Sequence, residues 1–167
     1  MIKKIFFLIP LLALIINCSG FEFVYNIANF DKIKEKTLFS ISGDNKDIIN
    51  SYLSNKFGKV GGDPVYILSV VSSESIEAVV IESDATASKF MIKHDLKYKL
   101  DNINKKCTVF EKDILTKNSY DAKSAGYSFG TDLAEKELST KNLHSNIDQF
   151  LNELLINYNN LKCKNES

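Results

Sequence analysis

The cysteines carry the first chemistry that this sequence offers, and Cys18 occupies the most informative position. Lys3 and Lys4 form a short basic start, and an apolar run follows over residues 5–16. This order is typical of a secretory signal peptide, and the run is shorter than the about 20 residues that span a bilayer. A cysteine at the end of the apolar run indicates a lipobox, at which cleavage leaves Cys18 as an acylated N-terminus. The alternative is an ordinary signal peptide with an incidental cysteine.

Cys107 and Cys163 are the two cysteines left after Cys18, and an exported protein resides where disulfides persist. Their spacing fits no zinc-binding pattern. A strand from Cys107 to Tyr120 covers roughly 43 Å, and a helix over residues 131–161 returns roughly 45 Å. If the helix lies antiparallel on the strand, Cys163 arrives near Cys107. We therefore expect a disulfide, with two separate thiols as the alternative.

Lysine side chains line one face of the strand expected over residues 89–100, where apolar and polar residues alternate. The lysines that share this face are Lys89, Lys93, Lys97 and Lys99. Such a row spans roughly 33 Å and can meet a multiply phosphorylated or carboxylated ligand. The alternative is a solubilising solvent face with Asp95 in its midst.

Few patterns in the sequence indicate catalysis or metal binding. It has no H-E-x-x-H and no P-loop, and a single G-x-S-x-G occurs over residues 126–130. His94 falls on the apolar face of its strand, so a hydrogen-bonded core histidine is favoured over a general base. The other histidine, His144, is expected at the surface. We therefore expect no enzyme activity, no metal site and no cofactor.

Length and charge bound the class of protein. Removing residues 1–17 leaves 150 residues, which suits one domain with a core of its own. Basic and acidic residues number 21 each, every basic residue is lysine, and Lys3 and Lys4 leave with the signal peptide. The mature chain therefore lacks the basic excess that would indicate nucleic-acid binding.

Hydrophobic periodicity predicts the elements that position these residues. The predicted strands cover residues 37–42, 65–82, 89–100 and 107–120. The predicted helices cover residues 48–57 and 131–161. Because short loops join the last three strands, we expect them to form an antiparallel meander. The order predicts an α+β fold, a two-layer sandwich with a mostly antiparallel four-stranded sheet and two helices on one face.

The predicted boundaries follow from the same reading. Residues 1–17 are the expected signal peptide, residues 18–36 the lipidated N-terminus and tether, and residues 37–167 a single α+β domain. Asp44 or Asn45 is expected to cap the first helix. If the second strand is interrupted, a bulge fits between Ser72 and Ser75.

Several segments together resemble the LPS-assembly lipoprotein family, LptE. Cys18 is followed closely by Gly20-Phe21 and then by Val24-Tyr25, as in many members. The element order, the alternating strand from Thr86 to Leu100 and the run Leu133-Ala134-Glu135-Lys136-Glu137 that opens the last helix are also similar. Departures from the family are Ser19 inserted before Gly-Phe and the absence of arginine; Asn17 stands where a lipobox usually has Gly or Ala before its cysteine.

The resemblance implies a function. Such proteins are lipid-anchored at the periplasmic face of the outer membrane, sit as a plug inside the LptD β-barrel, and help to deliver lipopolysaccharide to the cell surface. They also bind lipopolysaccharide, and on this interpretation the lysine row contacts its phosphates or acidic sugars. Nucleic acid is not an expected partner.

Two other functions compete with this interpretation. One is another envelope lipoprotein, such as an auxiliary subunit of a lipid transporter. The other is a secreted hydrolase with an unrecognised site.

Overall fold

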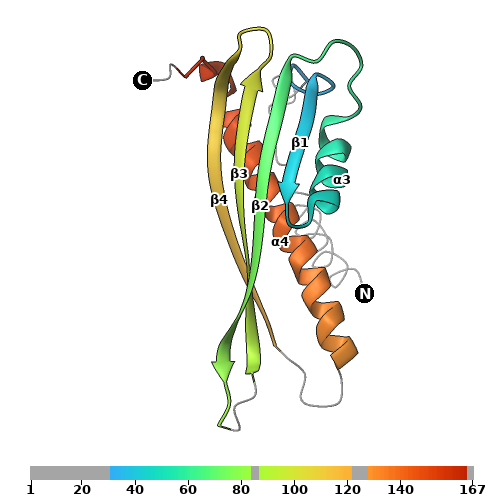
Figure 1. The fold of residues 1–167 in the computed structure, drawn as a ribbon, viewed down its shortest axis with the longest axis vertical. Helices are drawn as coiled ribbons and strands as arrows, with labels where there is room; N and C mark the ends of the chain where they lie inside the picture. The colour runs from blue at the N-terminus through green and yellow to red at the C-terminus, as the bar shows by residue number, and fades with distance from the viewer. Residues whose placement is uncertain (1–30, 84–86, 122–127, 165–167) are drawn as a thin grey trace, which may run out of the picture.

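Four strands form one sheet in the order β1-β2-β3-β4, and two helices pack against one of its faces (Figure 1). The structure is a computed structural model that describes residues 31–83, 87–121 and 128–164. Its elements are β1 (Thr37–Gly43), α3 (Lys46–Phe57), β2 (Tyr66–Ile81), β3 (Ala87–Asn102), β4 (Cys107–Asp121), α4 (Ser128–Ile156) and the short 3₁₀ helix η2 (Tyr158–Asn160). The predicted two-layer α+β sandwich with a mostly antiparallel sheet is confirmed.

The sheet combines one parallel pair with an antiparallel meander. β1 runs parallel to β2, from Thr37 opposite Tyr66 to Gly43 opposite Ser72, and α3 lies in the crossover that such a pair needs. β2, β3 and β4 are antiparallel neighbours, which confirms the predicted meander.

β2 is a single strand of 16 residues that extends well past β1. Its pairing with β3 is continuous from residue 72 to residue 75, the position suggested for a bulge from the sequence. The register shifts instead between Ala78 and Ile81, close to the end of the strand. The suggested position of the irregularity was therefore wrong, because serine content alone does not show where pairing is disturbed.

β3 alternates between a covered face and an open face, as its sequence predicts. The fully buried residues of this strand are Ile92, His94, Leu96, Tyr98 and Leu100. Asp95, Lys97 and Lys99 alternate with them and are exposed. The helices cover only one side of the sheet, so the other side meets solvent.

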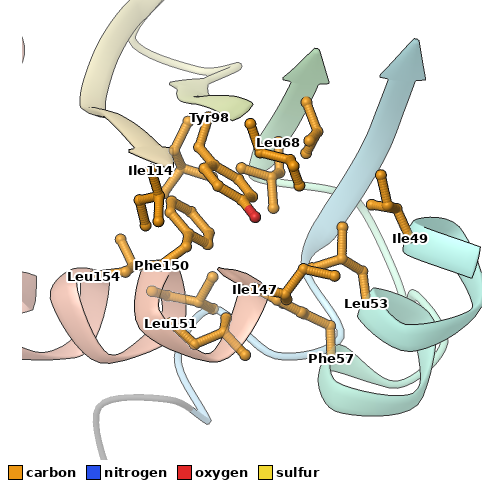
Figure 2. Packing of buried hydrophobic residues seen from close by; sticks show 14 of the residues in the cluster. Ile49, Leu53, Phe57, Leu68, Tyr98, Ile114, Ile147, Phe150, Leu151 and Leu154 are labelled. Carbon is orange, nitrogen blue, oxygen red and sulfur yellow. The ribbon is translucent and has the colours of Figure 1, made fainter. Parts of the chain in front are cut away.

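The core lies between the sheet and the two helices. Figure 2 shows Phe150 of α4 against Tyr98 of β3, with Leu53 and Phe57 of α3 completing the cluster. The Tyr98 and Phe150 rings are stacked, with their centroids 4.1 Å apart. α4 buries only the side that faces the sheet. No helix in the described part of the chain has the length and apolarity needed to cross a membrane.

The packed part of the chain begins before β1. Ile33 is fully buried in the core, and its carbonyl accepts a hydrogen bond from the Thr37 hydroxyl at 3.0 Å. Residues 31–36, which were expected to belong to the tether, therefore pack with the folded domain. A single apolar residue between charged neighbours produces no period, so the sequence pattern could not show this.

Gly43 ends β1 in a conformation that suits glycine. Its φ is +90°, and a Cβ placed there would lie 1.9 Å from the Ser72 carbonyl oxygen of the neighbouring strand. The turn that follows places Asn45 at the N-cap of α3, where its side chain makes no capping hydrogen bond and reaches Glu74 instead.

We predict that Gly43→Ala lowers the free energy of unfolding by more than about 2 kcal/mol, because the methyl group collides with backbone that cannot move aside. Gly62→Ala is the matched control, since a Cβ at Gly62 meets nothing within 4 Å. Denaturant unfolding of both variants measures the difference. Equal stability of the two variants would contradict this view of the β1 end.

Candidate functional site

The predicted disulfide is present in the structure between Cys107 and Cys163, whose Cα atoms are 5.5 Å apart. α4 packs along β4, and the chain returns so that the Lys164 backbone N–H donates to the Thr108 carbonyl at 2.8 Å. Cys107 and Cys163 are 56 positions apart, and closing a loop of that size contributes about 4 kcal/mol on the loop-entropy account. Cys18, the expected lipidation site, lies outside the described residues, so its acylation stays a prediction.

The lysine row lies on the open face of β3, with Lys97 and Lys99 exposed and Lys89 and Lys93 half-buried. Each lysine has an acidic neighbour on an adjacent strand. The cross-strand partners are Asp121 for Lys89, Asp113 for Lys97 and Glu111 for Lys99, and Lys93 forms an ion pair with Glu77. The row therefore belongs to a surface of mixed charge, which the sequence of β3 alone could not show. Such exposed pairs are individually weak and can exchange partners.

A buried polar cluster occupies the other face of the sheet, where β2, β3 and α4 meet. His94 is fully buried, and its Nε2 lies 2.7 Å from Glu74 Oε2. The same carboxylate oxygen accepts hydrogen bonds from the Ser139 hydroxyl at 2.6 Å and from the Asn45 amide at 3.0 Å. The Glu74 carboxylate of β2 thus connects, through hydrogen bonds, to β3, to α4 and to the start of α3.

Two asparagines of α4 complete the cluster. Asn142 Nδ2 donates to His94 Nδ1 at 2.9 Å. Asn146 accepts a hydrogen bond from the Tyr98 hydroxyl at 2.8 Å and donates to Thr116 Oγ1 at 3.1 Å and to the Ile114 carbonyl at 2.8 Å. Because Asn142 occupies Nδ1 as a donor, the proton of neutral His94 sits on Nε2 and points at Glu74.

This cluster contains a serine, a histidine and a carboxylate, yet their arrangement differs from a catalytic relay. In a relay the carboxylate holds the ring nitrogen opposite the one that faces the serine. Here Glu74 and Ser139 both lie beside His94 Nε2, with the Ser139 oxygen 3.2 Å from it. The geometry favours a structural role, in which the buried polar groups form hydrogen bonds with one another and fix the position of α4 on the sheet.

Burial lowers the pKa of His94, and the hydrogen bond and charge of Glu74 offset part of that effect. The predicted role of His94 as a hydrogen-bonded core residue agrees with its position. Glu74, Ser139, Asn142 and Asn146 were not singled out from the sequence, because an isolated polar residue gives no sign of being buried.

His144 lies between α3 and α4, half-buried rather than fully at the surface. Its ring stacks on Tyr52 with the centroids 3.8 Å apart. The Tyr52 hydroxyl donates to Asp148 Oδ2 at 2.9 Å, and Lys56 forms an ion pair with the other oxygen of Asp148 at 3.0 Å. Burial lowers the pKa of His144 as well. This second polar contact joins the two helices.

A hollow lies at the end of the sheet where β3 turns into β4. It has a volume of about 600 Å³, and its lining includes the disulfide and Glu111. The lysines that line it are Lys99, Lys105, Lys106 and Lys164. Of these, only Lys99 was a candidate from the sequence, because the others come from a turn and from the C-terminal segment, which the disulfide brings together.

Comparison with known proteins identifies solved structures that share this fold. No family model matches the chain, and no curated protein matches it in sequence. A protein described as a lipoprotein from Caulobacter crescentus CB15 matches its structure with a TM-score of 0.60 at 12% identity, over 79% of this chain and 97% of that chain. Rare lipoprotein B from Shewanella oneidensis matches with a TM-score of 0.58 at 11% identity, over 75% of this chain and 97% of that chain. The fold is one that known lipoproteins share.

We predict that His94 in the folded protein titrates below pH 6.5, the ordinary histidine pKa. The unfolded chain then binds more protons than the folded protein at and just below that pH, so stability falls as the pH drops through this range. Proton NMR of the two imidazoles measures the pKa values, and a His144→Gln variant assigns the signals. A His94 pKa at or above 6.5 would show that burial is not the main influence on the protonation of this side chain.

Proposed function

We propose that this protein is a lipoprotein of the outer membrane that is anchored through Cys18 at the periplasmic face, binds lipopolysaccharide and assists an LptD-type β-barrel in its transport. The observation that carries the proposal is the shared fold with rare lipoprotein B over 97% of that chain. The position of Cys18 after a signal-like segment and the LptE-like residues described above add to it.

The shape of the sheet supports a role inside a barrel. Strands of 15 and 16 residues span about 50 Å, which exceeds the about 30 Å thickness of a bilayer core. The interior of an outer-membrane barrel is polar. The open sheet face, with its alternating lysines and acids, is compatible with such a wall.

The far end of β2 supplies an apolar contact surface. Every residue of this strand from Ser75 to Ile81 is exposed, and β1 does not extend alongside it. We call this surface the β2 tip; its large apolar residues are Ile76, Val79, Val80 and Ile81. Exposed apolar patches commonly mark contacts with a partner.

A binding role, with no catalysis, is part of the proposal. The serine, histidine and carboxylate that come together at Glu74 lack relay geometry, and His94 is fully buried. A hydrolase would need these groups to reach a substrate.

We predict that the tagged mature chain recovers a large β-barrel from outer-membrane detergent extract and that Ile81→Glu lowers this recovery several-fold, because a charge enters the apolar β2 tip. Ile156→Glu is the matched control, since Ile156 is also highly exposed but lies at the end of α4. Recovery of an inner-membrane transport complex in place of the barrel would favour the auxiliary subunit of a lipid transporter.

We also predict that Lys93→Glu combined with Lys97→Glu weakens lipopolysaccharide binding by about tenfold, because each reversal removes an attraction of up to about 1 kcal/mol. Lys136→Glu with Lys141→Glu on the exposed side of α4 changes the net charge equally and should leave binding intact. Titration of labelled lipopolysaccharide measures both. Unchanged binding in the first variant would remove the lysine row from the function.

A further inference from the structure

Four segments that are distant in sequence meet at the end of the sheet where β1 begins (Figure 1). The Val65 backbone N–H donates to the Lys36 carbonyl at 2.9 Å, and the Val65 carbonyl accepts from Ile103 at 2.9 Å. Lys164 of the C-terminal segment is bonded to Thr108 at the start of β4. This end, which we call the basic end, comprises residues 31–36, 58–65, 99–111 and 161–164.

Charge is distributed unevenly between the basic end and the rest of the domain. The basic end contains nine lysines and five acidic residues, whereas the remaining described residues contain nine lysines and 13 acidic residues. The whole chain is formally neutral. The domain is therefore positive at one end and negative elsewhere, and a field of this kind orients a protein toward an anionic surface.

The hollow beside the disulfide lies within the basic end and carries part of this charge. Lys164 is paired with Glu111 at 3.6 Å and Lys99 with Asp101 at 3.7 Å. Within the described ranges, neither Lys105 nor Lys106 has an ion-pair partner, and both side chains are exposed at the β3–β4 turn. Two lysines are thus available to an external anion.

The chain enters the fold at this same end. Asp31, the first described residue, stands 13 residues after Cys18, and 13 extended residues reach at most about 45 Å. Lys32 lies over the Tyr158 ring, 5.5 Å from its centroid, so the entry point adjoins the segment that leads to Cys163. An acyl group on Cys18 would therefore hold the basic end within reach of the membrane.

We propose that the basic end rests on the anionic phospholipid headgroups of the membrane that anchors the chain, with Lys105 and Lys106 at the centre of the contact. This inference rests on the proposed function only for the anchoring through Cys18. Polybasic surfaces beside a lipid anchor strengthen membrane binding in this way.

Sedimentation with lipid vesicles tests the proposal on the mature chain, from residue 18 onward, carrying Cys18→Ser so that no acyl group contributes. We expect binding to vesicles that contain phosphatidylglycerol, little binding to pure phosphatidylcholine vesicles, and a decline with rising salt. Lys105→Gln with Lys106→Gln should weaken the binding by roughly 30-fold.

The control is Lys136→Gln with Lys141→Gln, which removes the same charge from α4, and thermal unfolding checks that both variants fold. No binding to phosphatidylglycerol vesicles, or an equal loss in both variants, would overturn the proposal. Because the chain tested has no acyl group and no barrel is present, the result is independent of whether Cys18 is modified or a barrel is recovered.

Discussion

α4 packs along β3 and β4, and this contact positions the core, the buried polar cluster and the disulfide. This helix of 29 residues runs back along β3 and β4. Together with α3 it covers one face of the sheet, and the other face is left open. Its apolar stretch, including Ile147 and Phe150, forms the core with α3. Its polar stretch, with Ser139, Asn142 and Asn146, meets His94 and Thr116. Its return also brings Cys163 to Cys107, which closes the basic end.

The sequence predicts those features that repeat with a period. Alternation in β3 identified its buried face, and the lengths of strand and helix were enough to pair Cys107 with Cys163. Features that depend on one residue were missed. Ile33 has charged neighbours, and Asn146 resembles any polar residue of an amphipathic helix. The acids beside the lysine row come from other strands, so only the strand register shows that the row lies in a surface of mixed charge.

The domain has different chemistry at its two ends and on its open face. One end is basic and holds the disulfide, and the other extends β2 beyond β1 with exposed apolar side chains. Between them lies a sheet face of alternating charge. On the proposed function, this division suits the ends to headgroups and protein and the face to a polar barrel wall. The buried polar cluster around His94 holds α4 against the sheet and so fixes the positions of these surfaces relative to one another.

The proposed function requires membrane anchoring through Cys18, which mass spectrometry of the N-terminal peptide from membrane-purified protein can establish. A protein processed as proposed begins at Cys18 and carries the mass of its acyl groups. A chain that begins elsewhere, or an unmodified Cys18, would contradict the anchoring while leaving the fold unchanged.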